Sequence, residues 1–363
     1  MSLLTWSASR DTALDACERR YFLSYITHAR ANSRDARLRE IAVLKKVQTI
    51  SMWQGDVFHR LAATYLRLVR DGRTACDPDA ATASGDRLLA EALVEMRLDW
   101  DASAEGRYRA IAARATRPGA GRRGTRRAAT PQISLGFGLD DAATNIESGG
   151  AEDRRLALFE HEYRMELRPD AFETARDAVT AWFHRFLSWI AAERFDLRVR
   201  QARRIWIEPA TFGPTAPGFR SGTVQVLAKV DFAMEEADRR FTVVDWKTGA
   251  PRTAAGPYDD DAEYQVTVYQ LWPHLTLGVP LDRVLARVVF VAADPIIDRV
   301  YTIDAETRER AMRRVARGIR RALALHGSGD HAALAEADFD YARHHAFCRG
   351  CGFKRLCQGE QAS

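Results

Sequence analysis

Several kinds of segment are missing from this chain of 363 residues, and each absence excludes a class of protein. No stretch approaches 18 uninterrupted apolar residues, so we expect no transmembrane helix. The N-terminal MSLLTWSASRDTALDACERR lacks a charged region followed by an apolar one, so it does not resemble a secretory signal. No G-x-x-x-x-G-K-[ST] sequence occurs, so we expect no nucleotide-driven motor. These absences favour a cytoplasmic protein without a membrane partner.

Lysine and cysteine are both scarce. Only five of the 54 basic side chains are lysines, so a lysine inside a charged motif is not compositional noise. The excess of arginine suits phosphate recognition and is equally explained by a base-composition bias in the source genome. The net charge of +5 permits an anionic partner without demanding one. In a reducing cytoplasm, clustered cysteines among the five present are metal ligands more often than disulfides.

The first half of the chain reads as mainly helical. Apolar residues recur at helical spacing over 11–30, about 45–70, about 84–100 and 170–195. The aromatic stripe of the last helix is expected to be core. Residues 115–153 differ, because Gly, Pro, Thr and Ser accumulate there beside a basic run. This segment is either a mobile loop or a basic arm that touches a nucleic-acid backbone. The run consists of Arg114, Arg117, Arg122, Arg123, Arg126 and Arg127.

Strands dominate the second half. We expect strands over 204–212, 223–234 and 241–248, a helix over 259–272, a buried strand over 283–293 and a helix over about 304–325. A strand, a helix and a further strand in this order describe an α/β core with one crossover.

Two neighbouring strands carry the strongest functional signal. Asp231 is expected to close the first strand, and Asp245 and Lys247 close the second. Because side chains two apart share a strand face, Asp245 and Lys247 point the same way as Phe241 and Val243. Two carboxylates and a cation at strand ends suit a divalent metal beside a scissile phosphate. The alternative is a surface hairpin that ends in an ordinary Lys–Asp pair.

Four further residues are weaker candidates for the same site. Gln265 and Tyr269 are four apart, so they share a helix face that could look onto the metal, or they are a half-buried polar pair. His59 is either a core histidine or a ligand whose imidazole favours manganese somewhat over magnesium. Glu208 either reaches a second metal through water or is an exposed residue at a strand end.

The cysteines give the second signal. Cys348, Cys351 and Cys357 form C-x2-C-x5-C near the C-terminus, Cys17 lies far upstream, and Cys76 is left over as a lone thiol. Three close cysteines and one remote cysteine favour a 4Fe–4S cluster over zinc, which prefers two paired knuckles. Buried thiols without a ligand are the third alternative.

Taken together, these segments give the chain a family resemblance. It resembles the RecB-like branch of the PD-(D/E)XK nuclease superfamily, and more narrowly the members with an iron–sulfur cluster, such as the AddB nuclease domain and CRISPR-associated RecB-like exonucleases. One departure is Ala228-Lys229, where the family often has glycine before the first aspartate. The matching pieces are SASRDTALDACERRYFLSYI, GDVFHRL, AKVDFAM, VVDWKTG, QVTVYQ and CRGCGFKRLC.

The resemblance implies a restriction-endonuclease-like α/β core, a mixed sheet flanked by helices, with a large helical insertion and an Fe–S clasp joining the termini. It implies an N-terminal helix over 1–30, a helical region over 31–203, a nuclease core over 204–325 and a cysteine motif over 326–363. His59, Asp231, Asp245 and the Trp246 carbonyl would bind Mg2+ or Mn2+. Lys247, Gln265 and Tyr269 would complete the catalytic site. The four cysteines Cys17, Cys348, Cys351 and Cys357 would hold the 4Fe–4S cluster.

The function implied is a metal-dependent DNA exonuclease that acts on single strands or ends, in repair, recombination or phage and CRISPR defence. A helicase or another subunit would supply any unwinding. The alternative is a non-catalytic DNA-binding or scaffold subunit with the same fold. A zinc-stabilised regulatory protein is a third reading.

Overall fold

The computed structural model describes residues 5–27, 35–74, 78–109, 156–211, 216–251, 260–326 and 334–361. The predicted loop over 115–153 with its arginine run, and Cys76, lie outside these residues. None of the described helices is both long and apolar enough to cross a membrane.

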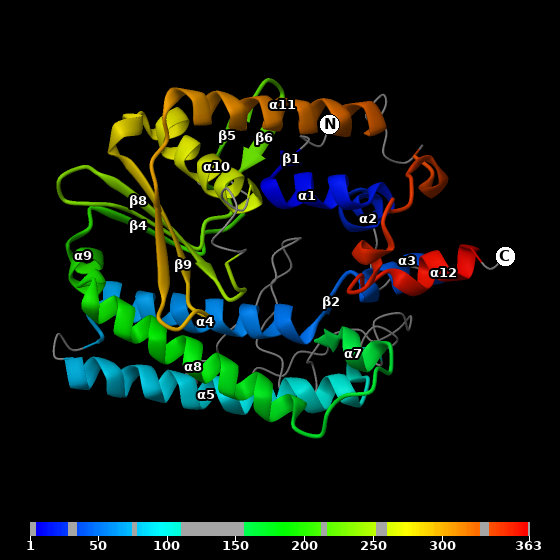
Figure 1. Ribbon diagram of the computed structural model, residues 1–363, viewed down its shortest axis with the longest axis horizontal. Helices are drawn as coiled ribbons and strands as arrows, with labels where there is room; N and C mark the ends of the chain where they lie inside the picture. Colours follow the sequence, from blue (N-terminus) through cyan, green and yellow to red (C-terminus); the bar gives the residue numbers. More distant parts are fainter. Residues whose placement is uncertain are drawn as a thin grey trace, which may run out of the picture.

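A five-stranded mixed sheet forms the centre of the protein (Figure 1). Within this sheet β8 and β9 pair in parallel, and the other three pairs are antiparallel. Parallel neighbours need a crossover, and α10 (Asp260–Leu277) supplies it, which confirms the predicted strand–helix–strand unit. The strand order is β10 (Ile297–Tyr301), β9 (Val284–Phe290), β8 (Phe241–Lys247), β7 (Phe232–Glu235) and β4 (Arg204–Ile207).

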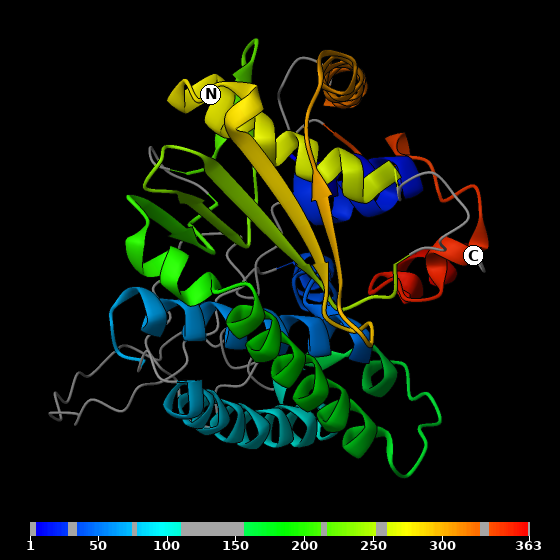
Figure 2. The same cartoon turned by 60° about the vertical axis from the view of Figure 1, so that its left-hand side comes forward.

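The two faces of this sheet carry separate hydrophobic cores. Side chains alternate along β8, so Phe241 packs towards α10, where its ring lies 5.5 Å from that of Trp272. Trp246 points to the opposite face, 5.1 Å from Phe186 of α8 (Ala171–Ala192). In Figures 1 and 2, α10 lies on one side of the sheet, and α4 (Ile50–Arg70), α5 (Pro78–Ala104), α8 and α9 (Phe195–Gln201) lie on the other. The aromatic stripe of α8 is core, as expected.

The predicted strand over 223–234 is wrong, because it is two strands in two sheets. β6 (Val224–Leu227) joins a small sheet with β1 (Thr5–Trp6) and β5 (Gly218–Ser221), whereas β7 belongs to the central sheet. Between them the chain turns, with Val230 N donating to Ala228 O at 3.0 Å. Apolar alternation continues on both sides of this turn, so the sequence pattern does not show the change of sheet.

The N-terminal helix predicted over 11–30 is also interrupted. α1 (Ala8–Ala16) ends at Cys17, α2 (Glu18–Tyr21) follows, and a π-helical turn covers Phe22–Ile26. Cys17 has an extended backbone (φ −167°), and its sulfur accepts from Arg20 N at 3.3 Å, so it caps α2. The break therefore lies at the first of the predicted cluster cysteines.

The other predicted helices are present with shifted ends. Thr49 caps α4 by accepting from Met52 N at 3.3 Å, and α5 begins at Pro78, earlier than expected. The strand predicted over 204–212 ends at Ile207. The edge strand β10 was not predicted, because only one of its five residues is buried. The remaining elements include α3 (Ala36–Leu44), β2 (Val47–Gln48), β3 (Ala157–Leu158), α7 (Phe159–Glu162), α11 (Ala305–His326) and α12 (Lys354–Gln361).

The two ends of the described chain meet. Arg19 N donates to Asp340 O at 2.9 Å, and the Arg19 side chain donates to Phe339 O at 3.1 Å. In Figure 1, α1, α2 and α12 lie on the same side of the molecule. The segments that carry the predicted cluster cysteines are therefore neighbours in space.

Candidate active site

Hairpin pairing brings the two predicted carboxylates together. β7 and β8 are antiparallel with Phe232 opposite Val244, so the start of β7 lies beside the end of β8. Asp231 comes directly before β7, and its Oδ2 accepts from Trp246 N at 2.9 Å. The prediction that Asp231 closes a strand is therefore wrong. It lies beside Asp245 because it precedes the first strand of the hairpin.

Lys247 connects this strand end to α10. Its Nζ lies 2.8 Å from Asp245 Oδ2 and donates to Gln265 Oε1 at 2.8 Å. Gln265 Nε2 in turn donates to the Tyr269 hydroxyl at 2.6 Å. The expected shared face of Gln265 and Tyr269 is observed, and it faces the end of β8. Four predicted residues thus form one chain of hydrogen bonds across the strand end and the helix.

His59 reaches the same place from α4. Its Nδ1 lies 3.4 Å from Asp231 Oδ1. One turn earlier on α4, Gly55 faces Thr248 so closely that a Cβ there would lie 3.0 Å from the Thr248 hydroxyl. Gly55 was not predicted as a site residue, although a glycine inside an otherwise regular helix was a visible signal. Its small size lets α4 approach the end of β8.

Glu208 follows β4 in a left-handed conformation (φ 39°), which is uncommon for a side chain of this kind. Its N–H donates to Asp231 O at 2.8 Å, so it is held against the residue before β7. Glu208 is exposed, as one of its two predicted alternatives has it, but partial desolvation raises the pKa of its carboxyl, the nearby Asp231 raises it further, and His59 opposes the shift. The structure therefore places this weaker candidate within electrostatic reach of the other carboxylates.

Burial and mutual charge set the protonation of the site. Burial raises the pKa of Asp245, Lys247 opposes that shift, and Asp231 reinforces it. Burial alone would lower the pKa of His59, but Asp231, and then Asp245, raise it to about 9. The pKa of Asp231 is lowered overall because His59 and Lys247 outweigh its burial. In the metal-free protein, the positive charges of His59 and Lys247 thus oppose the negative charges of the two carboxylates.

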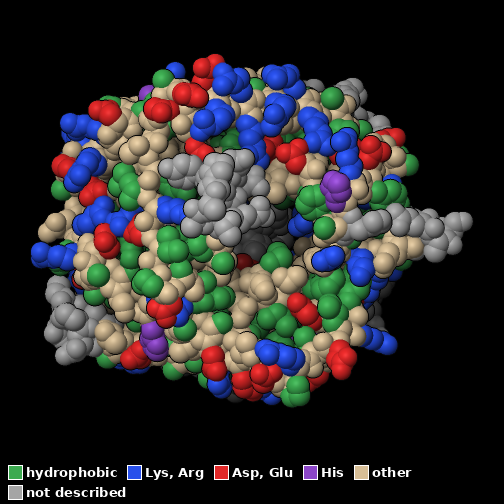
Figure 3. Space-filling view, viewed as in Figure 1, with side chains coloured by type: hydrophobic (Ala, Val, Ile, Leu, Met, Phe, Trp, Pro, Cys, Tyr) green, Lys and Arg blue, Asp and Glu red, His purple; other side chains and the backbone are tan. Residues whose placement is uncertain are grey.

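The site is open on one side. The exposed fractions of the side chains are 30% for Lys247, 25% for His59, 19% for Asp231 and 3% for Asp245. The space-filling view in Figure 3 shows a hollow at the centre of this face, between the positions of α10 and α4 in Figure 1. A ligand can therefore approach Lys247 and His59 more easily than Asp245.

The donor atoms of the site are of the kinds that bind a hard divalent cation, but they are not arranged around a common point. Among the described residues, no three His, Cys, Asp or Glu side chains are arranged as ligands of a common ion. Asp231 interacts with Trp246 N and His59, and Asp245 pairs with Lys247. Two carboxylates and an imidazole are nevertheless the oxygen and nitrogen donors that Mg2+ and Mn2+ accept.

The four predicted cluster cysteines form no disulfide among the residues that the structure describes, and each is of intermediate exposure. Burial raises the pKa of Cys351, Arg20 opposes the shift, and Cys17 and Cys348 add to it, so these three thiols lie within electrostatic reach. Burial also raises the pKa of Tyr163 to about 12, with contributions from Cys351 and Cys357. The two ends of the chain thus bring the cysteines to one region, although the described thiols do not already form a metal cage.

Glycine and tyrosine contacts hold the C-terminal cysteine segment in place. Gly352 packs so tightly that a Cβ there would lie 2.5 Å from Leu44 O. The Tyr163 hydroxyl donates to Gly352 O at 2.8 Å and accepts from Arg355 N at 3.3 Å. The segment that carries Cys351 and Cys357 is therefore fixed against α3 and α7.

The sequence matches the PD-(D/E)XK nuclease superfamily over residues 5–140 and 142–358, which is most of the chain. The chain belongs to this superfamily. Its mixed sheet with helices on both faces is consistent with the PD-(D/E)XK fold. Superfamily members are generally nucleases that use Mg2+ or Mn2+, so a nuclease is the function that the family suggests.

Comparison with curated proteins gives no match. Among solved structures, one that matches is described as "Crystal structure of SSO0001", with 14% sequence identity and a TM-score of 0.27. The alignment covers 55% of this chain and 77% of that chain. A TM-score this low does not establish a shared fold.

Proposed function

We propose that this PD-(D/E)XK protein is a metal-dependent DNA exonuclease of the RecB-like branch, acting on single strands or DNA ends. One observation carries the proposal. Lys247 lies 2.8 Å from both Asp245 Oδ2 and Gln265 Oε1, at a strand end that also holds Asp231. A surface Lys–Asp pair would not need the additional partners Gln265 and Tyr269, which are held in line by a 2.6 Å hydrogen bond.

Asp231, Asp245, His59 and the Trp246 carbonyl would hold Mg2+ or Mn2+. The bound ion would supply an acidic water and a positive charge beside the scissile phosphate. His59 carries a proton in the metal-free protein and would release it when it becomes a ligand. Asp231 would keep its position through Trp246 N, because that hydrogen bond comes from the backbone of β8.

Lys247 would turn from Asp245 towards the phosphate and stabilise the negative charge that develops there. Gln265 would limit this movement by keeping its hydrogen bond to the ammonium group. Tyr269 keeps its hydroxyl proton, because burial raises its pKa well above the usual value, and Asp245 and Asp231 raise it further. Its role would be to hold Gln265 in place.

We also propose that Cys17, Cys348, Cys351 and Cys357 hold a 4Fe–4S cluster. The support is the three-plus-one spacing and the meeting of α2 with the C-terminal segment, where Cys17, Cys348 and Cys351 influence one another. The cluster would be structural, since it would fix the N-terminal helices to α12. Zinc in the same place is the alternative that metal analysis would distinguish.

The proposed process is repair, recombination or phage and CRISPR defence, with unwinding supplied by a helicase or another subunit. The absence of a G-x-x-x-x-G-K-[ST] sequence from the chain supports an external motor.

The test is a nuclease assay on end-labelled single-stranded and double-stranded DNA and on RNA, with Mg2+, Mn2+ or EDTA. We expect shortening of DNA from an end with either metal, and no cutting in EDTA. The Asp245→Asn variant should not cut. Cutting of wild type and Asp245→Asn at equal rates would refute the site. DNA binding without cutting by a metal-loaded wild type would support a non-catalytic subunit instead.

A further inference from the structure

Helix α11 carries far more arginine than its packing requires. Its 22 residues, AETRERAMRRVARGIRRALALH, contain seven arginines and two glutamates. The buried positions are small or apolar, and Gly318 lies so close to α1 that a Cβ there would meet Asp11 Oδ1 at 2.3 Å. One face of the helix therefore packs, and the arginines occupy the remainder.

Some of these arginines have a structural role. Arg314 Nε lies 2.8 Å from Asp11 and its guanidinium stacks over Tyr264 at 4.0 Å. Arg321 lies 2.7 Å from Asp15, and Arg310 lies 2.7 Å from Glu263 of α10. These contacts fix α11 to α1 and α10.

Three other arginines are more exposed, although the charge of Arg317 also acts on Asp11 and Tyr264. Among the residues that the structure describes, Arg313 pairs only with Glu309 of its own helix, and Arg317 and Arg320 form no ion pair. All three are exposed. At 100° per residue their backbone positions fall within about 60° of the helix circumference, and this set of three is called here the α11 arginine face. From Arg313 to Arg320 this face is about 10 Å long.

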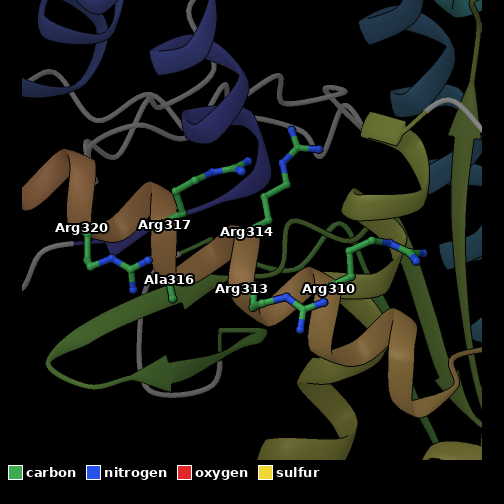
Figure 4. A pocket seen from close by; sticks show the side chains of 6 residues that line it. All are labelled: Arg310, Arg313, Arg314, Ala316, Arg317 and Arg320. Atoms are coloured by element: carbon green, nitrogen blue, oxygen red, sulfur yellow. The ribbon is translucent and has the colours of Figure 1, made fainter.

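The arginines line a hollow on the surface. Arg310, Arg313, Arg314, Ala316, Arg317 and Arg320 surround a volume of about 440 Å³. Figure 4 shows Arg313 and Arg320 leaving one side of α11, with Arg310 at one end, whereas the Arg314 and Arg317 side chains extend to the other side. Guanidinium groups around an open hollow suit the oxygens of phosphate groups, which they bind through paired hydrogen bonds.

The N-terminal half of α11 is joined to α10, the helix that carries Gln265 and Tyr269 of the candidate active site. Arg310 is ion-paired with Glu263, which precedes Gln265 by two residues on α10. In Figure 3, Lys and Arg side chains gather over α11, on the same face of the molecule as the central hollow. A strand that enters the hollow can therefore pass onto α11 without crossing to the far side of the molecule.

We propose that the α11 arginine face, Arg313, Arg317 and Arg320, binds the phosphate backbone of the nucleic acid whose end occupies the metal site. This inference rests on the proposed nuclease function and adds a second contact outside the reacting atoms. The contact is independent of sequence, because it involves phosphate and not base edges. The contact increases the affinity for a substrate long enough to reach both α11 and the metal site, and does not change the affinity for a shorter one.

The test compares binding of a 5′-fluorescein 30-nucleotide DNA and a 6-nucleotide DNA by anisotropy in EDTA, where no cutting occurs. The Arg313→Ala/Arg317→Ala/Arg320→Ala variant keeps a good helix-forming residue at each position. Its affinity for the 30-mer should fall on the order of tenfold, with a salt dependence weaker by about 0.7 per lost phosphate contact. Its affinity for the 6-mer should equal that of wild type.

The matched control is Arg87→Ala/Arg107→Ala/Arg168→Ala, which removes the same charge from exposed positions on the α5 and α8 side. It should bind both oligonucleotides as wild type does. Unchanged 30-mer binding by the α11 variant would overturn the proposal. If the α11 variant binds DNA as wild type does but no longer binds phosphatidylserine vesicles, the arginines bind a membrane surface and the proposal is also overturned. Cutting by wild type is measured separately, so failure of the nuclease function is distinguishable.

Discussion

The active-site end of β8 and the cysteine region are assembled by different means. Asp231 and Asp245 flank one hairpin, and the register of β7 against β8 places them together. The cysteine region instead depends on contacts such as Cys17 with Asp340, 323 residues apart. A short loop costs little entropy to close and a long one costs more. The first region is therefore held by the sheet itself, whereas the second would gain most from an inorganic centre.

The largest expected effect is a loss of cutting rate in a protein that still folds. Asp245→Asn keeps the shape of the side chain but removes a charge that Lys247 and the proposed metal both contact. We expect cutting to fall by at least about 10²-fold, as for loss of a group that stabilises the transition state. DNA binding and iron content should be unchanged. Rates are measured on an end-labelled oligonucleotide with Mn2+.

The control for this variant is Asp238→Asn, an exposed carboxylate in the turn of the same hairpin. It should cut at the wild-type rate. An Asp245→Asn protein that lost its iron would show that the two regions are not independent.

The next effect concerns the cysteine region. Cys348→Ala should remove the cluster and lower the free energy of unfolding by about 3 kcal/mol or more, as expected for loss of a tightly bound ligand of the native state. Iron analysis, visible absorbance and thermal unfolding measure it. Cys76→Ser, outside the proposed ligand set, should retain iron. A Cys348→Ala protein with full iron content and unchanged stability would contradict the cluster.

A smaller effect tests the approach of α4 to the strand end. Gly55→Ala would place a Cβ 3.0 Å from the Thr248 hydroxyl, which must then move. We expect a loss of about 1 kcal/mol of transition-state stabilisation in kcat/KM, because Thr248 follows Lys247. Adding Thr248→Ala removes the clashing oxygen and should restore part of the rate. Additive losses in the double variant would show that the contact is not the cause.

The smallest effect concerns the turn end of the β7–β8 hairpin, far from the proposed metal. Burial would raise the pKa of Glu236, but hydrogen bonds from Arg198 and Thr242 lower it below its usual value. A carboxyl with a lowered folded-state pKa stabilises the protein above its unfolded pKa and loses that contribution as pH falls through the folded value.

Acidification below about pH 4.5 should therefore destabilise wild type more than Glu236→Gln, by about 1 kcal/mol, the usual worth of such a hydrogen bond. Chemical unfolding at pH 3.5 and pH 7 measures the difference. Equal pH dependence in the two proteins would assign the acid sensitivity to other carboxylates.

Several features could be read from the sequence because they depend on neighbouring residues. The strand–helix–strand order of β8, α10 and β9 followed from apolar runs of suitable length. The shared faces of Asp245 with Lys247, and of Gln265 with Tyr269, followed from strand and helix periodicity. These relations are set by backbone geometry, so the tertiary structure did not change them.

Other features could not be read in the same way. The turn at residues 228–231 moves the chain from one sheet to another, although apolar alternation continues through it. The break at Cys17 depends on a capping contact within a helical pattern. The role of Gly55 depends on Thr248, a residue of another element. The Gly55 contact is decided by a partner distant in sequence, whereas the turn and the break at Cys17 are local features that the apolar pattern does not reveal.

The sequence by itself determined which chemical groups this protein has and the local elements that carry them: a hairpin with an Asp-Trp-Lys end, a helix with Gln and Tyr on one face, and a three-plus-one set of cysteines. The tertiary structure decided which of them meet. It placed Asp231 at the start of β7, brought His59 from α4 to within 3.4 Å of it, and joined the two ends of the chain. Local periodicity fixes the direction of a side chain, but only packing between distant segments fixes its neighbours.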